Sequence, residues 1–114
     1  MSYKELLAWQ SAMDLCEATY RITERFPRRE IFGLTAQLRR SAVSVPSNIG
    51  EGEGRLTWGE RRLFLSNARG SLFELESQLI IATRVGYRDN SDVLQQLDGT
   101  RNVLDGYIHY VRKR

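Results

Sequence analysis

The chain has 114 residues, 41% of them hydrophobic, and a net charge of +3, which fits one folded domain over residues 1–114 and excludes a disordered chain. Its only cysteine, Cys16, excludes an internal disulfide, and its only histidine, His109, makes a metal site improbable, so we expect neither metal nor cofactor. With no secretion signal and no apolar run of membrane-spanning length, we expect a soluble cytoplasmic protein without membrane contact.

The first predicted helix runs from about Lys4 to Phe26, where apolar residues recur every three or four positions. Pro27 ends it, and residues 28–33 form the turn. The predicted inward line is Leu6, Trp9, Met13, Cys16 and Tyr20, and a second line of Leu7, Leu15 and Ile22 widens that face.

The second predicted helix begins at about Leu34 and contains Pro46, which has no amide hydrogen to donate to the carbonyl of Ala42. We expect a kinked helix, because the apolar spacing continues in phase from Val45 to Ile49. The alternative is that a new helical segment starts at Pro46. Three alternating glycines are then predicted to unwind the helix end, at Gly50, Gly52 and Gly54.

The third and fourth helices follow from capping and spacing signals. Thr57 and Glu60 form a capping box, so the third helix should begin there and end near Gly86, and Ser91 is predicted to cap the fourth. The predicted core positions are Leu65, Ala68, Leu72, Leu75, Leu79 and Ala82, then Leu94, Leu97, Leu104, Ile108 and Val111. The pattern predicts an all-α, antiparallel four-helix bundle.

The third predicted helix is apolar on two sides, which is typical of a helix that is buried on both. A glycine on its outer side would allow a second backbone to approach closely. We therefore predict a subunit interface there, and the alternative is a monomer with scattered exposed apolar residues. The interface candidates are Leu63, Gly70, Phe73, Ile80 and Ile81.

The polar residues around the glycines offer little for catalysis. The sequence of residues 50–54, GEGEG, lacks the lysine of a phosphate-binding loop and follows a helix rather than a strand. Glu51 and Glu53 lie near Asn48 with no histidine beside them, so we expect Glu51 to pair with Arg39, Arg40 or a neighbouring subunit's arginine. We expect Asn48 to hold loose backbone, and we expect no enzyme.

The arginines favour contact with a polyanion. Residues 21–69 carry ten arginines against five acidic residues, and residues 112–114 are all basic. Arginine binds phosphate in a bidentate manner, and Trp58 within this set could stack on an unpaired base. The alternative is a solvated surface with helical ion pairs such as Glu17–Arg21 and Glu24–Arg28. The nucleic-acid-binding candidates are Arg25, Arg28, Arg29, Arg39, Arg40, Arg55, Trp58, Arg61, Arg62, Arg112, Lys113 and Arg114.

The chain resembles the S23 family, four-helix proteins encoded within intervening sequences of bacterial 23S rRNA genes. The matching residues are Phe26–Pro27, FGLTAQLRRSAVSVPSNIGEG (residues 32–52), Arg55, Phe64, Ala68, Gly70–Ser71 and residues 74–76. The family usually has alanine where this chain has Gly50. The signature positions are Arg39, Arg40, Pro46, Asn48, Glu51, Gly52 and Arg55.

The resemblance implies a homopentamer. It also implies kinship with the accessory proteins of diversity-generating retroelements, basic pentamers that bind nucleic acid and a reverse transcriptase. We therefore expect a non-enzymatic oligomer that binds RNA or DNA through phosphates. The alternative is a scaffold for a protein partner such as a reverse transcriptase, with arginines that pair between subunits. An enzyme using Asn48 and Glu51 is the least favoured reading.

Overall fold

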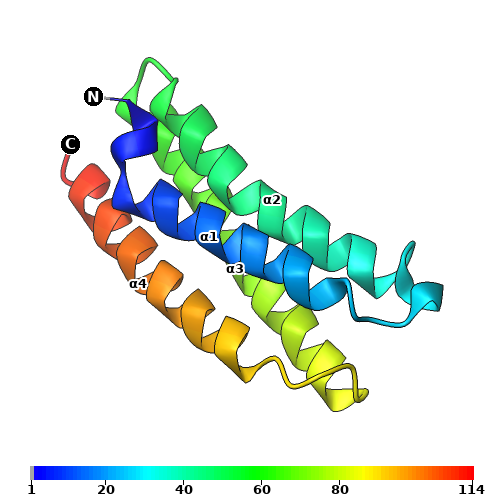
Figure 1. Cartoon of the computed structure of the whole chain (residues 1–114). Coiled ribbons are helices and arrows are strands. Elements are labelled where there is room, and N and C mark those ends of the chain that lie inside the picture. Colours follow the sequence, from blue (N-terminus) through cyan, green and yellow to red (C-terminus); the bar gives the residue numbers. More distant parts are fainter. Residues whose placement is uncertain (1) are drawn as a thin grey trace.

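The computed structural model describes residues 2–114 and is built from helices (Figure 1). Four α-helices follow one another, and two short 3₁₀ helices, η1 (Tyr3–Glu5) and η2 (Arg28–Glu30), precede the first and second of them. The four are α1 (Leu7–Thr23), α2 (Leu34–Glu53), α3 (Trp58–Arg84) and α4 (Ser91–Arg112). The predicted all-α class with four helices is confirmed. Within residues 2–114, no helix is long and apolar enough to cross a membrane.

The helices alternate in direction, and each packs against its two neighbours in the order α1, α2, α3, α4 and back to α1. The bundle measures 44 × 24 × 20 Å. Both ends of the chain and the α2–α3 turn therefore lie at one end, which we call the terminal pole (Figure 1). The α1–α2 and α3–α4 connections lie at the other end, the opposite pole.

The cores of α2, α3 and α4 follow the predicted spacing. All six predicted positions of α3 are fully buried, as are Leu38, Ala42, Val45 and Ile49 of α2. In α4, Leu97, Leu104 and Val111 are buried, and the other two predicted positions pack against the core while partly exposed.

The predicted inward line of α1 is wrong at two of its five positions, Met13 and Tyr20. The buried residues of α1 are Ala8, Ala12, Leu15, Thr19 and Thr23, whereas Met13 and Tyr20 are each 40% exposed and Trp9 and Cys16 are half-buried at the edge of the bundle. Small alanines let α1 approach its neighbours closely. The two buried threonines satisfy their hydroxyls by donating to carbonyls one turn earlier, at 2.9 and 2.8 Å. Apolarity alone therefore places the buried face only in part. Leu15 is buried and Leu6, Cys16 and Ile22 pack against the core, but Leu7 is 63% exposed.

α2 continues further than the glycine pattern predicts. It runs as one helix through Pro46 to Glu53, and only Gly54 serves as its C-terminal cap. The interpretation that a new segment starts at Pro46 is therefore wrong, while the degree of bending at Pro46 stays a prediction. Gly52 remains helical because it packs against α3, where a Cβ atom would lie 3.0 Å from the Cβ of Phe64.

One of the two predicted caps is confirmed. The Thr57 hydroxyl accepts a hydrogen bond from the amide of Glu60 at 3.1 Å, and α3 begins directly after Thr57. Ser91 is not the cap of α4, because Asn90 occupies that position and Ser91 is already helical. The amide of Ser91 is bound instead by the Asp89 carboxylate at 3.0 Å, a turn contact that the periodicity does not reveal.

We predict that Gly52→Ala lowers the melting temperature relative to Gly106→Ala. Both glycines lie inside helices, where alanine gains about 1 kcal/mol. A methyl group at Gly106 enters open space, but at Gly52 it meets Phe64, and such overpacking costs about 1–3 kcal/mol. Thermal unfolding followed by circular dichroism measures both variants. Equal melting temperatures would contradict close packing at Gly52.

Candidate functional site

The terminal pole gathers seven of the twelve predicted nucleic-acid-binding residues. The start of α3 faces the last turns of α4, where Arg62 and Arg112 line one pocket of about 280 Å³ with Ile108 and Val111. Basic residues reach this pole from the α2–α3 turn, the start of α3 and the C-terminus. They are Arg55, Arg61, Arg62, Arg112, Lys113 and Arg114. The C-terminal residues thus join the α2–α3 turn in one basic surface, which the sequence does not reveal.

The remaining predicted arginines lie toward the opposite pole and form a separate group. Arg39 is held there as a structural residue, because its Nε donates to the Thr23 hydroxyl at 2.9 Å and its guanidinium lies 4.7 Å from the centre of the Tyr20 ring. Arg29 lies 5.8 Å from the centre of the Tyr87 ring. The predicted set also includes Arg25, Arg28 and Arg40, which are exposed. One patch of twelve residues therefore does not exist in the single chain.

Arginines at the terminal pole rest on aromatic rings. The guanidinium of Arg61 lies 4.6 Å from the centre of the Trp58 ring, and that of Arg114 lies 4.5 Å from the centre of the Tyr110 ring. Such stacking holds the guanidinium by its face and leaves its N–H groups free to point outward. These side chains are therefore ordered without a carboxylate partner.

Ion pairing leaves several arginines of the terminal pole free. Across residues 2–114 four ion pairs form, and none of them includes Arg61, Arg62 or Arg112. Glu51 pairs with Arg55 at 2.8 Å, so the expected pairing with Arg39 or Arg40 is wrong. The predicted Glu17–Arg21 pair is present at 3.7 Å, but Glu24–Arg28 is not among the pairs of the described residues. Unpaired arginines at one pole make that pole attractive to anions.

A pocket of about 750 Å³ opens at the terminal pole between the N-terminal segment, the end of α2 and the end of α4. Tyr107 lines this pocket and donates its hydroxyl hydrogen to Glu53 Oε2 at 2.6 Å. Burial, together with this hydrogen bond, raises the pKa of Tyr107 well above its usual range. The main side chains that line the pocket are Tyr3, Glu53, Trp58, Arg61, Tyr107 and Tyr110. Only Trp58 and Arg61 were predicted, since lone tyrosines far apart in sequence carry no signal of a shared pocket.

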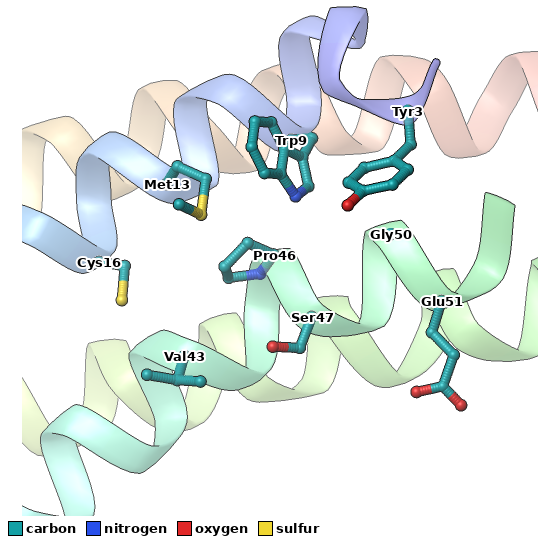
Figure 2. Close-up of a pocket in the computed structure, with 9 residues that line it drawn as sticks. All are labelled: Tyr3, Trp9, Met13, Cys16, Val43, Pro46, Ser47, Gly50 and Glu51. Carbon is teal, nitrogen blue, oxygen red and sulfur yellow. The ribbon is translucent and has the colours of Figure 1, made fainter. Parts of the chain in front are cut away.

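A second groove, of about 550 Å³, separates α1 from α2 (Figure 2). Trp9, Met13 and Cys16 of α1 face Val43 and Pro46 across it, so residues of the predicted inward line form its wall. Burial raises the pKa of the Cys16 thiol, and a protonated thiol is a poor nucleophile. The groove is an apolar surface rather than a reactive site.

The signature segment of α2 forms polar contacts with α3. Asn48 donates to the Ser44 carbonyl at 2.8 Å, and the Ser44 hydroxyl bonds to that of Ser71 at 2.8 Å. The buried Ser41 hydroxyl donates to the Glu74 carboxylate at 2.7 Å. Asn48 therefore binds backbone one turn earlier in α2 and not the glycine segment. The hydrogen bonds of Ser41 and Ser44 to α3 form a row of polar contacts, the polar seam, which the sequence does not reveal. The seam joins the two helices.

The predicted interface residues of α3 are uncovered in the single chain. Leu63 is 59% exposed and Ile81 50%, Ile80 is also exposed, and nothing lies within 4 Å of a Cβ atom built on Gly70. Phe73 lies beneath Arg69, whose guanidinium is 4.7 Å from the ring centre. An interface over this face stays a prediction.

Comparison with known proteins finds a matching family and a solved structure with the same fold. A family model described as 23S rRNA-intervening sequence protein matches residues 4–106. Among solved structures, the chain resembles a protein with unknown function from the S23 ribosomal protein family of Bacteroides thetaiotaomicron VPI-5482. That likeness has a TM-score of 0.79 at 18% identity and covers 90% of this chain and 98% of the other. At this identity it shows a shared fold. No curated protein matches the chain.

We predict that Tyr107→Phe reduces the pH dependence of the free energy of unfolding at alkaline pH. The pKa of Tyr107 is raised in the folded state, so its contribution is complete below the unfolded value of about 10. It is lost as the pH rises from there toward the folded pKa, because the tyrosinate cannot donate to Glu53. Urea unfolding at neutral pH and above pH ~10 measures this dependence, and identical pH dependence in both proteins would contradict it.

Proposed function

The chain belongs to the 23S rRNA-intervening sequence protein family, and from that premise we propose that it is a non-enzymatic, homo-oligomeric protein that binds RNA or DNA through its terminal pole. The solved relative is itself of unknown function, so the support for this proposal comes from the surface of the chain. The observation that carries it is the group of arginines at one pole, of which Arg61 and Arg114 lie on aromatic rings and form no ion pair within residues 2–114.

The chemistry of this surface suits phosphates. Arg61, Arg62 and Arg112 form no ion pair within residues 2–114, and Lys113 and Arg114 extend the charge. Binding would release counterions from the nucleic acid, so affinity should fall steeply with salt. Recognition would depend mainly on the backbone, because phosphate contacts carry no sequence information.

An oligomer would strengthen this binding. The uncovered apolar face of α3, with Leu63, Gly70 and Ile81, supports contact between copies, and the family resemblance favours a pentamer. Several basic poles on one particle would bind a long polyanion more tightly than a single pole, because each further contact becomes intramolecular.

The second candidate is a scaffold that binds a protein partner. The apolar groove between α1 and α2 favours it, since Trp9 and Met13 offer a surface that a partner could cover. In that case the arginines would form ion pairs between subunits. The two candidates differ in what a reversal of charge at the terminal pole would change.

We predict that Arg62→Glu combined with Arg112→Glu weakens nucleic-acid binding at least about ten-fold and lowers the salt slope by about two. The matched control is Arg21→Glu with Arg84→Glu, which has the same net charge and lies away from the terminal pole. Fluorescence anisotropy with a labelled DNA duplex across a salt series measures affinity, and light scattering measures molar mass.

Equal losses in the two double variants would contradict a specific role for the terminal pole. A pole variant that keeps its affinity but loses molar mass would favour arginines that pair between subunits, and thus the scaffold.

A further inference from the structure

The pocket at the terminal pole has a composition that neither the phosphate contacts nor the bundle core requires. Its exposed rings are Tyr3, at 37% exposure, Trp58, at 38%, and Tyr110, at 47%. Glu53 is the only carboxylate among its lining residues, and Gly50 contributes no side chain to the wall. Aromatic faces beside one acceptor and one guanidinium suit a flat, polar ligand.

Two partly exposed rings of the pocket, Tyr3 and Trp58, are not stacked on another aromatic ring within residues 2–114. Arg61 covers only one face of Trp58, and Tyr3 meets Trp9 edge-on, with ring planes at 77°. By contrast, Tyr110 is stacked against Tyr107, with ring centres 5.9 Å apart, and is also covered by Arg114. A planar ligand would therefore stack on Tyr3 or Trp58, while the α4 tyrosines form a fixed wall.

The hydrogen-bonding capacity of the pocket is also selective. Glu53 Oε2 accepts from Tyr107, and within residues 2–114 no donor is bonded to Oε1. A carboxylate oxygen accepts N–H donors and repels other acceptors. The neighbouring arginines disfavour a cationic ligand, so an aromatic cage for an ammonium group does not fit this pole.

We propose that this pocket holds one unpaired nucleobase, guanine in preference to the others, from a strand bound at the terminal pole. The inference rests on the proposed function and adds a base-reading site to it. The ring would stack on Trp58 or Tyr3, Arg61 would contact the adjoining phosphate, and Glu53 would accept from the base. Guanine fits best because its pairing edge presents two adjacent N–H donors.

The experiment compares single-stranded RNAs that differ at one position. A uridine-rich strand carries a guanosine, an adenosine or an abasic site at its centre, and anisotropy measures each affinity alongside a DNA duplex. We expect the native protein to bind the guanosine strand about ten-fold more tightly than the abasic strand, a gain typical of stacking on an aromatic side chain.

Two variants assign this preference to the pocket. Trp58→Leu should bring the guanosine-to-abasic ratio close to one. Glu53→Gln still accepts from Tyr107 but loses the carboxylate, so it should reduce the preference for guanosine over adenosine. The matched control is Phe32→Leu, an aromatic residue that is 95% exposed at the opposite pole and should leave every ratio unchanged.

Each result decides between the two proposals. If the native protein binds the duplex but treats guanosine and abasic strands alike, the base pocket is wrong and the phosphate surface stands. If it binds neither duplex nor strand, the proposed function fails and the pocket fails with it. If Trp58→Leu retains the full ratio, or Glu53→Gln the full guanosine preference, the assignment of that residue is overturned.

Discussion

The close contact between α2 and α3 is the constraint on which the rest of the molecule depends. Gly52 brings the two helices together at Phe64, and farther along them hydrogen bonds join Ser41 to Glu74 and Ser44 to Ser71. This contact fixes where α3 begins, and so where Trp58, Arg61 and Arg62 emerge. Because the helices alternate, the same geometry brings the end of α4 alongside, and the terminal pole forms as a consequence of the core.

At that pole, the groups that order the arginine side chains do not neutralise their charge. Aromatic rings hold Arg61 and Arg114 in place, whereas in most surface ion pairs the same task falls to a carboxylate that also cancels the charge. A guanidinium held by a ring keeps its charge available to phosphate. This separation explains how a chain with a net charge of only +3 can present a strongly basic end.

The sequence predicted the bundle and most of its core, because periodic leucines and alanines of α2 and α3 report directly on burial. It failed where small and polar residues do the packing, as with Ala8, Ala12 and Thr19 of α1. It also placed the end of α2 too early, since the packing partner of Gly52 lies on another helix. At the candidate site it identified the arginines but could not bring Tyr3, Glu53 and Tyr107 together, because these residues meet only through tertiary folding.

The central claim is that nucleic acid binds at the terminal pole, and ultraviolet crosslinking of a bound single-stranded RNA followed by mass spectrometry tests it most directly. Bases crosslink readily to the aromatic side chains on which they stack, so the account predicts adducts at Trp58 or Tyr3. Adducts confined to residues 20–40 at the opposite pole, or to the outer face of α3, would contradict it.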